Sequence, residues 1–339
     1  MQEILARNKI FAHPDRLGER IKNGITKPIT VEIDPTNRCN HKCPFCAGNR
    51  LFGSAELSLD NMAHIIDQLK PFVRGIIFTG GGEPFMNTHI TDAISYANNF
   101  GIEVGVITNG GLLNKYNMGD LVANTKRIRI SINGLDKDDF KKKNGLGEDE
   151  YNQARTNVMD LVKEKHKQNS QSTIGIGYLT EDNESYKNLR DFSKKAKETG
   201  ADYVQFRPYH HSKKNIAEYI ERCKNEFKDE NFDVLYSIEK YERRVYDYKM
   251  AFADEFRTVI TADGNMYPDC FTRGIKEFCF GNILENTFDE IWNSDKKKQI
   301  IQNKLQQKNC PRQCFQEPLN QILWDIYKIN KEGKHINFI

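Results

Sequence analysis

The stretch CNHKCPFC, residues 39–46, decides the fold of this chain. It follows an apolar, strand-like run over residues 29–33 and contains three cysteines in the spacing Cys-x3-Cys-x2-Cys: Cys39, Cys43 and Cys46. Three thiolates on one short loop can bind three irons of a cubane [4Fe–4S] cluster and leave the fourth iron without a protein ligand. The competing interpretation is structural zinc, which usually needs four ligands. No fourth cysteine lies nearby in the sequence, and His41 between two ligands is badly placed to complete a tetrahedron, so the ligand count favours an iron–sulfur cluster.

Length and composition describe an ordinary folded chain. Its 339 residues suffice for one large domain and a smaller one, and 38% hydrophobic with 29% charged residues is typical of globular proteins. The formal net charge of +3 is too small to indicate binding to nucleic acid. We find no apolar run of about 18 residues and no signal-peptide pattern, so we expect no membrane partner. Eight cysteines in such a chain indicate a reducing, cytoplasmic location.

Six apolar runs of strand length alternate with amphipathic segments before residue 210. The expected strands span residues 29–33, 75–79, 103–108, 127–132, 173–179 and 203–207. They are short and apolar on both faces, as in a parallel sheet covered by helices. Between them apolar residues recur with helical period, first at Met62, Ile65, Ile66 and Leu69 behind the N-cap residue Ser58. This pattern predicts an α/β fold whose functional groups gather at the carboxyl ends of the strands.

The second expected strand ends in the run Gly80-Gly81-Gly82-Glu83. Consecutive glycines let a backbone approach a ligand closely. Together with the cysteine spacing and Phe45 before the third cysteine, this run resembles the signature of the radical S-adenosylmethionine (SAM) enzymes. The resemblance implies a partial (β/α)6 TIM-like barrel. It also implies a [4Fe–4S] cluster whose open iron chelates SAM, one-electron cleavage of SAM to a 5′-deoxyadenosyl radical, and contact of Gly81, Gly82 and Glu83 with the methionine amino group.

Further strand ends match the same family less specifically. Asn109 follows the third expected strand, and RIRISING places Ser131 where relatives contact the SAM carboxylate or ribose. Asn133 stands where many relatives have aspartate, so we assign it no catalytic role. The fifth expected strand resembles the strand that contacts adenine, which makes Tyr178 a cofactor-binding candidate; for Ile176 ordinary sheet core is the favoured interpretation.

Arg207 ends the sixth expected strand and is followed by His210, His211, Lys213 and Lys214. A guanidinium at the mouth of a barrel can hold a carboxylate or phosphate through two parallel hydrogen bonds. We therefore expect Arg207 to contact SAM or substrate, with a solvated loop as the alternative for the residues that follow it.

The C-terminal region contains four more cysteines: Cys270, Cys279, Cys310 and Cys314. They can supply four ligands to a second [4Fe–4S] cluster or to zinc. The pattern YPDC…CFGNILENTFDEIW…CPRQC resembles the SPASM/Twitch extension of radical SAM enzymes, which implies an auxiliary [4Fe–4S] cluster. With four cysteines we expect one such cluster, although the Cys-x3-Cys spacing at the end departs from the commoner Cys-x2-Cys.

These motifs divide the chain into four expected parts. They are an N-terminal extension over 1–28, a radical SAM core over 29–212, a charged helical bridge over 213–254, and an α+β auxiliary-cluster domain with a C-terminal helix over 255–339. Within the last part, Asp263-Gly264 is a strong hairpin signal.

Cys223 belongs to neither cysteine set. In some radical SAM epimerases a lone cysteine returns a hydrogen atom to the substrate radical, and Cys223 is a catalytic candidate on that ground. It shares a helical face with Ile216, Tyr219, Ile220 and Phe227, so a small buried thiol in a core is the alternative.

The family resemblance implies an enzyme that abstracts a hydrogen atom from its substrate. We expect a small polar substrate, such as a sugar, an aminocyclitol or a sugar nucleotide, oxidised to a ketone with help from the auxiliary cluster. About 28 residues before the first strand are too few for the leader-recognition domain of many peptide-modifying relatives. Peptide epimerisation or cross-linking, and a non-catalytic iron–sulfur or zinc protein, remain the alternatives. A flavodoxin or ferredoxin is the expected electron donor.

Overall fold

The computed structural model describes residues 7–46, 48–209, 212–242, 246–307, 310 and 317–333. Its centre is one sheet, in the order β10-β9-β8-β1-β2-β3-β4-β5-β6-β7. The first seven strands are β1 (Thr30–Ile33), β2 (Gly75–Phe78), β3 (Glu103–Thr108), β4 (Arg127–Ser131), β5 (Thr173–Thr180), β6 (Tyr203–Pro208) and β7 (Asp233–Leu235). They pair in parallel, and the first six confirm the expected strands.

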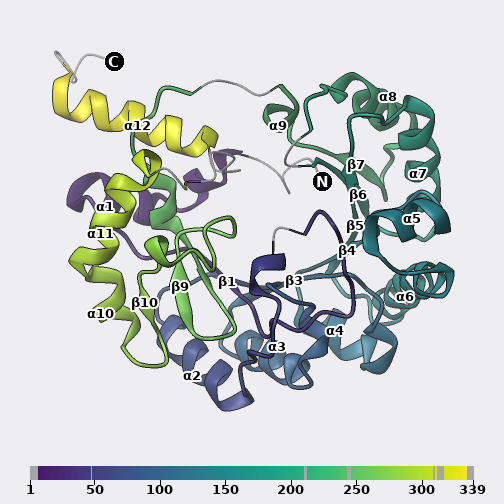
Figure 1. Cartoon of the computed structure of the whole chain (residues 1–339), viewed down its shortest axis with the longest axis horizontal. Coiled ribbons are helices and arrows are strands. Elements are labelled where there is room, and N and C mark those ends of the chain that lie inside the picture. The colour runs from purple at the N-terminus through teal and green to yellow at the C-terminus, as the bar shows by residue number, and fades with distance from the viewer. Residues whose placement is uncertain are drawn as a thin grey trace.

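Helices cover the outside of this arc of strands, as Figure 1 shows. They are α2 (Leu59–Leu69), α3 (Ile90–Asn99), α4 (Met118–Asn124), α5 (Lys137–Asn144), α6 (Glu148–Lys167), α7 (Tyr186–Glu198) and α8 (Ala217–Phe227). Helix α2 begins where expected, because the Ser58 side chain accepts a hydrogen bond from the Asn61 N–H. The result is the predicted partial barrel with parallel strands inside and helices outside.

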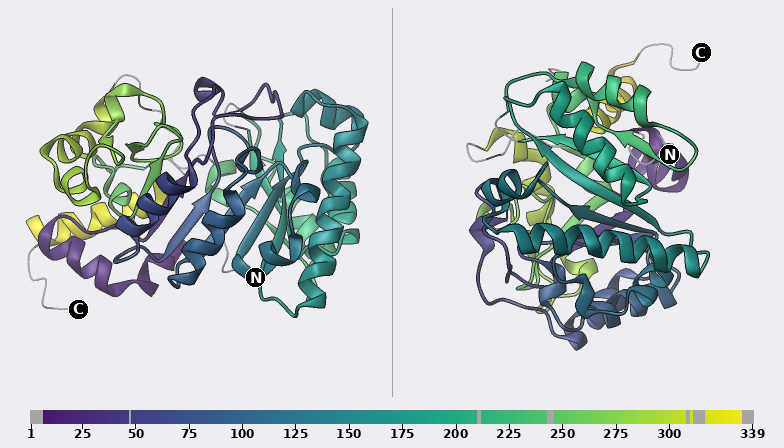
Figure 2. Two further views of the ribbon diagram at one scale, coloured as in Figure 1. Left: turned by 90° about the horizontal axis from the view of Figure 1, so that it is seen from below. Right: turned by 90° about the vertical axis from the view of Figure 1, so that its right-hand side faces the viewer.

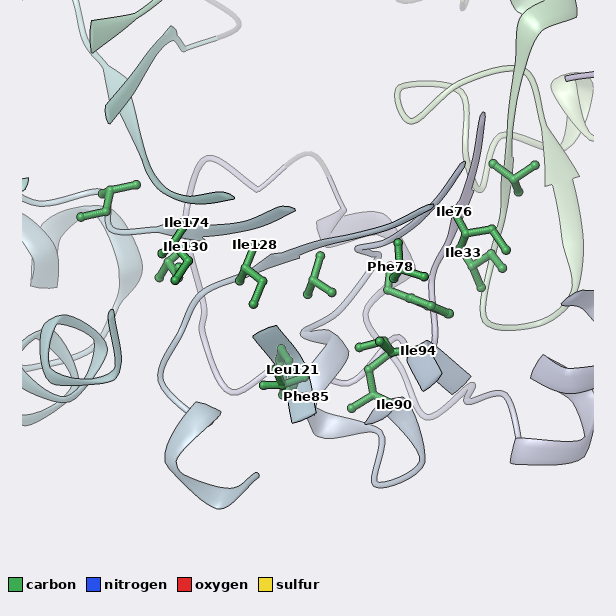
Figure 3. Close-up of a cluster of buried hydrophobic side chains, with 14 of the residues drawn as sticks. Ile33, Ile76, Phe78, Phe85, Ile90, Ile94, Leu121, Ile128, Ile130 and Ile174 are labelled. Carbon is green, nitrogen blue, oxygen red and sulfur yellow. The ribbon is translucent and has the colours of Figure 1, made fainter. Parts of the chain in front are cut away.

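Side chains that alternate along each strand separate an outer face from an inner face. On the outer face, Ile33, Ile76 and Phe78 pack with Ile90 and Ile94 of α3 in a buried apolar core (Figure 3). The inner face faces away from these helices and, on β4 and β6, carries Arg129, Ser131, Gln205 and Arg207 in alternate positions. The outer face therefore supplies the apolar core, while the inner face is polar.

The segment over 213–254, expected to be a helical bridge, also extends the sheet. After α8, the short strand β7 pairs in parallel with β6, and α9 (Ile238–Glu242) follows. The expectation of helix alone was wrong at β7, where a three-residue strand is too short to leave a clear pattern in a charged sequence.

The C-terminal module continues the same sheet. Its strands are β8 (Arg257–Ile260), β9 (Asn265–Tyr267) and β10 (Gly281–Asn282). Strand β9 pairs antiparallel with both β8 and β10, and β8 pairs in parallel with β1. Gly264 has φ +81° in the turn between β8 and β9, which confirms the hairpin expected at Asp263-Gly264. Helices α10 (Phe288–Asn293) and α11 (Asp295–Asn303) complete the module (Figure 2).

The two ends of the described chain pack together. A second apolar cluster joins Ile10 of the 3₁₀ helix η2 (Arg7–Ala12), Phe252 and Phe256 of η6 (Phe252–Phe256), and Leu323 of α12 (Glu317–Glu332). Helix α1 (Pro14–Asn23) lies beside α12 in both figures, and Leu17 contacts the same cluster. No helix in the described ranges is long and apolar enough to span a membrane.

Candidate active site

The cysteine loop lies across the carboxyl ends of the core strands (Figure 1). The Phe45 ring packs in a tilted arrangement against the ring of Tyr209, just after β6, with ring centroids 4.3 Å apart. On the other side the Lys42 N–H donates to the Asn144 carbonyl at the end of α5, and the Cys43 Sγ lies 3.7 Å from the Asn144 Oδ1. These contacts hold the three cysteines over the mouth of the partial barrel.

The three thiols lie close enough to influence one another. Burial raises the pKa of Cys39 to about 11 and that of Cys43 to about 12, and the charge of Cys46 adds to both shifts. The His41 N–H donates to the Cys39 Sγ at 3.4 Å and the Gly48 N–H to the Cys46 Sγ at 3.3 Å. Backbone N–H···S bonds of this kind stabilise thiolates bound to iron.

The arrangement of the loop fits a cluster better than a single ion. Among the described residues no three His, Cys, Asp or Glu side chains converge on one point as a mononuclear metal requires. A cubane is bound at three separate irons, so its ligands need not converge. His41 is buried against Phe140, its pKa is lowered to about 4 by burial, and it does not complete a tetrahedral site. His41 therefore supplies no fourth ligand for a tetrahedral zinc site at this triplet.

The glycine run after β2 packs against the backbone that leads into the cysteine loop. A Cβ on Gly82 would lie 2.1 Å from the Arg38 carbonyl oxygen, and one on Gly81 would lie 2.6 Å from the Asn37 Oδ1. The Glu83 N–H donates to the same Arg38 carbonyl at 2.8 Å. Gly82 is thus required by contact with the chain itself, in addition to any role toward SAM.

Glu83 is a buried carboxylate that joins the ends of β2 and β3. Its Oε1 accepts from the Thr108 hydroxyl at 2.5 Å and the Phe85 N–H at 3.2 Å, and its Oε2 accepts from the Asn109 N–H at 2.7 Å. Burial raises its pKa to about 7, and these three hydrogen bonds oppose that rise. The Asn109 side chain in turn donates to the Asn40 Oδ1 at 2.7 Å. Glu83 and Asn109 therefore connect the glycine run to the cysteine loop.

Ser131 ends β4 on the inner face and is half-buried. Its hydroxyl has no hydrogen-bond partner within the described ranges, which leaves it available to a ligand. Asn133 is occupied instead, because its Oδ1 accepts from the Leu179 N–H at 3.0 Å and its carbonyl accepts from the Asn144 side chain at 3.1 Å. That structural role agrees with the absence of a catalytic assignment for Asn133.

Tyr178 does not lie where the sequence placed it. Its ring packs between Phe192 of α7 and Phe206, on the outer face, and it is 1% exposed. Its hydroxyl lies in a buried ionic cluster, 2.8 Å from the Lys143 Nζ and 2.9 Å from the Glu184 Oε1. The expected cofactor contact was wrong, because both faces of β5 are apolar in sequence and the inner positions are the glycines Gly175 and Gly177.

Cys223 also lies away from the barrel interior. It is fully buried on α8, and its neighbours include Ser193 of α7 in the outer helix layer. Burial raises its pKa to about 11. A hydrogen-atom donor must reach a substrate radical inside the barrel, so the catalytic expectation for Cys223 was wrong and its packing alternative explains the residue.

Arg207 lies on the inner face of β6, two residues before the Tyr209 that contacts the cysteine loop. Burial lowers its pKa, while Tyr241, Cys270 and Tyr203 favour its charged form. Arg129 shares this inner face and was missed in the sequence. Its place two residues before Ser131 on the same strand was the signal that could have identified it. His210 and His211 lie outside the described residues, and Lys213 and Lys214 are exposed.

Three of the four C-terminal cysteines are described, and Cys314 lies outside the described residues. Cys279 precedes β10, with its Sγ 3.7 Å from the Asn265 Oδ1. A cavity of about 830 Å³ opens beside it, lined also by Tyr267, Gly274 and Gln307. Cys270 lies toward the core, where burial raises its pKa and Arg273 and Arg257 favour its thiolate. Cys279 at the cavity and the nearby cysteines of the C-terminal set are ligands of the kind that an auxiliary cluster requires.

A buried ion pair connects the regions of the two cysteine sets. Arg273 donates from Nη1 to both carboxylate oxygens of Asp34, each at 2.8 Å, and from Nε to the Cys270 carbonyl at 2.9 Å. Asp34 directly follows β1 on the path to the cysteine loop. The C-terminal module is therefore joined to the core by this pair as well as by the β8–β1 ladder.

Comparison with known proteins agrees with this geometry. The family model of the radical SAM superfamily matches residues 33–193, and the SPASM model, described as an iron–sulfur cluster-binding domain, matches residues 252–316. GTP 3′,8-cyclase of Staphylococcus aureus strain JH9 is 32% identical over 129 residues, 35% of this chain and 38% of the relative. The chain thus matches well under half the length of that relative.

Solved structures share the fold at low identity. Streptococcus suis SuiB bound to SAM has a TM-score of 0.67 at 15% identity, covering 96% of this chain and 81% of SuiB. The protein anSMEcpe with bound SAM has a TM-score of 0.58 at 16% identity, covering 85% and 89%.

The matched domains imply SAM and [4Fe–4S] clusters as cofactors, and the cysteine loop supplies a ligand set that fits. The cysteine loop, the glycine run, the parallel partial barrel and both family matches thus lead to one conclusion: this chain belongs to the radical SAM superfamily and carries a C-terminal SPASM-type iron–sulfur domain.

Proposed function

We propose that this enzyme abstracts a hydrogen atom from a small polar substrate held on the inner face of the barrel. The reaction oxidises an alcohol group of that substrate to a ketone. The observation that carries the proposal is the position of the cysteine loop, which lies over the carboxyl ends of strands whose inner face is polar. When bound, the cluster and SAM supply a carbon radical strong enough to take hydrogen from an unactivated C–H bond.

We assign the binding of the two clusters and of SAM to separate groups of residues. Cys39, Cys43 and Cys46 would hold the cluster, while Gly81, Gly82, Glu83, Asn109 and Ser131 would position SAM beside it. The substrate gives up a hydrogen atom from carbon, then a proton from its hydroxyl and one electron, which leaves a ketone. That electron would pass to an auxiliary cluster held by Cys270, Cys279, Cys310 and Cys314, and it balances the electron that a flavodoxin- or ferredoxin-type donor spends on cleaving SAM.

Anaerobic reconstitution tests the cofactor assignment. We expect about eight irons per chain, as two cubanes require, and reductive cleavage of SAM to 5′-deoxyadenosine. Replacing Cys39, Cys43 or Cys46 by Ala should abolish cleavage, and Cys223→Ala is the matched control because that thiol is buried in the helix layer. Two zinc ions per chain without SAM cleavage would contradict the proposal.

A second experiment tests the substrate class. Extract from cells grown in deuterated medium is separated into a low-molecular-mass fraction and a peptide fraction, and each is added to the enzyme with SAM and reductant. Deuterium in 5′-deoxyadenosine from the low-molecular-mass fraction supports a small substrate. Transfer from the peptide fraction alone would overturn it in favour of peptide modification, and SuiB has been solved with its precursor peptide SuiA.

A further inference from the structure

On the inner face of the sheet, Gly175 and Gly177 leave the middle of β5 without side chains, between β4 and β6. A Cβ on Gly175 would lie 2.0 Å from the Tyr203 Cζ, so the Tyr203 ring lies over this strand. A Cβ on Gly177 would lie 3.5 Å from the Cδ and Nε of Arg129. The two glycines therefore let long side chains from the flanking strands lie across β5.

Arg129 reaches over these glycines to β6. Its Nη1 donates to the Gln205 Oε1 at 3.0 Å, which is a neutral partner. Its Nε is buried and has no hydrogen-bond partner in the part of the chain that the structure describes, and the residue is 8% exposed. A buried guanidinium with a donor left unsatisfied is costly unless another group completes it.

Arg207 and Tyr203 each also have one buried polar atom that lacks a hydrogen-bond partner within the described ranges. These atoms are the Nε of Arg207 and the hydroxyl oxygen of Tyr203. Burial lowers the pKa of Arg129, and the charge of Arg207 lowers it further, so the two cations lie close enough to repel each other. Tyr203 acts on both guanidinium groups and thus lies near each.

No acid neutralises this pair among the described residues. Glu32 is the carboxylate whose charge acts on Arg129, but it forms an ion pair with Arg257 and lies 3.8 Å from Arg273. Arg127 adds a further positive charge nearby. The inner face thus carries an excess of positive charge at the point where three donors are unsatisfied.

We propose that Arg129, Arg207 and Tyr203 bind an anionic group of the substrate, a phosphate or a carboxylate, on the inner face of β4–β6. This inference rests on the proposed function and narrows its substrate class to anionic molecules. Planar guanidinium groups match the oxygen spacing of both anions, and the Tyr203 hydroxyl supplies an additional donor. Held at this depth, the anion leaves the rest of the substrate between the strands and the cysteine loop.

Binding of simple anions to the reconstituted protein tests the site. Inorganic phosphate and malonate serve as separate probes, at constant ionic strength with chloride, and their affinity is measured from the shift in the thermal unfolding temperature. We expect the wild type to bind at least one probe, and Arg129→Gln, Arg207→Gln and Tyr203→Phe to weaken that binding, each arginine by about tenfold or more. The stronger probe identifies the anion as phosphate or carboxylate.

Control measurements distinguish this site from nonspecific anion binding and from misfolding of the variants. Arg190→Gln removes an exposed arginine of α7 and should bind the probe as the wild type does. Iron content and circular dichroism show whether each variant folds, and SAM affinity should stay within about twofold of wild type. Equal probe binding by all variants, or no binding by the wild type, overturns the proposal. Loss of SAM affinity in the arginine variants also overturns it, because the anion would then be the carboxylate of SAM.

The two proposals fail separately. A wild type that cleaves SAM but binds neither probe refutes the anion site and leaves the radical chemistry intact. A wild type that binds a probe through Arg129 and Arg207 but cleaves no SAM refutes the proposed function, and with it the claim that the bound anion belongs to a substrate.

Discussion

Glu83 is a carboxylate whose protonation should be visible in the stability of the protein. Burial raises its pKa from an ordinary value of 4.5 to about 7, so the folded chain binds this proton more tightly than the unfolded chain. The contribution of Glu83 to stability is therefore complete below about pH 4.5 and is lost as the pH rises through about 7.

In the Glu83→Gln variant the side chain at position 83 does not gain or lose a proton in this pH range. Between those pH values the free energy of unfolding of the wild type should fall relative to that of the variant, by at most about 3 kcal/mol. Urea unfolding at a series of pH values under anaerobic conditions measures this difference, in which contributions of the clusters common to both proteins cancel. Parallel stability curves would contradict the expectation.

Gly82 has no room for a side chain. In Gly82→Ala the new Cβ meets the backbone of Arg38 and Asn37, so the loop that begins at Cys39 must shift. We expect the reconstituted variant to lose about four of its eight irons, because only the cluster on that loop is affected. Iron analysis and visible absorption measure the loss.

Gly18→Ala in α1 is the matched control for that experiment. No atom lies within 4 Å of a Cβ at this position, and alanine favours a helix over glycine by up to about 1 kcal/mol. Full iron content in both variants would show that the close approach at Gly82 is unimportant for the cluster.

Motifs in the sequence predicted where residues would lie, whereas strand patterns alone did not. The cysteine triplet and Glu83 lie at the strand ends, as their spacing and the neighbouring strand end predicted, and their ligand and cofactor roles stay predictions. Tyr178 was assigned to the wrong face because β5 is apolar on both faces, so alternation does not say which side faces the helices. Arg129 was missed because an arginine within a strand carries no motif of its own.

At the scale of elements, the Arg273–Asp34 pair joins the loop after β9 to the end of β1. Arg273→Met leaves the Asp34 carboxylate buried without its cation, and we expect a loss of about 3 kcal/mol in the free energy of unfolding at neutral pH. Burial already raises the pKa of Asp34, and Arg273 opposes that rise. The loss should therefore shrink as the pH falls and Asp34 takes up a proton.

Lys137→Met provides the comparison for this prediction. Lys137 and Glu148 form an ion pair at 2.9 Å with side chains that are 52% and 55% exposed, and such pairs contribute at most about 1 kcal/mol. Chemical unfolding of both variants at pH 5.5 and 7.5 measures the two effects. Similar losses in the free energy of unfolding for the two variants would show that the buried Asp34–Arg273 pair contributes no more to stability than an exposed pair.

The elements themselves were predictable in proportion to their length. The six core strands and the β8–β9 hairpin were expected because alternation, flanking glycines and Asp263-Gly264 act locally. The strands β7 and β10 have three and two residues, too few to show a period. The pairing of β8 with β1 joins segments more than 220 residues apart, and no local pattern encodes it.

At the scale of the molecule, the last described helix holds the first described residues in place. Leu323 of α12 is 4% exposed and packs with Ile10 and Phe252, whereas Ile329 on the same helix is 56% exposed. Leu323→Ala should cost about 2–4 kcal/mol in this cluster and speed amide hydrogen exchange in η2 and α1. Ile329→Ala should leave exchange there unchanged, and equal exchange in the two variants would refute the coupling.

The order of the sheet also bears on how the protein behaves at high concentration. An open sheet has two edges whose backbone amides can pair with another chain and start aggregation. Here the edges are β7 and β10, which have three and two residues, so each offers only a few unpaired groups. The long central strands lie inside the ladder and are shielded on both sides. The fold can thus remain unclosed while presenting a poor template for intermolecular strand pairing.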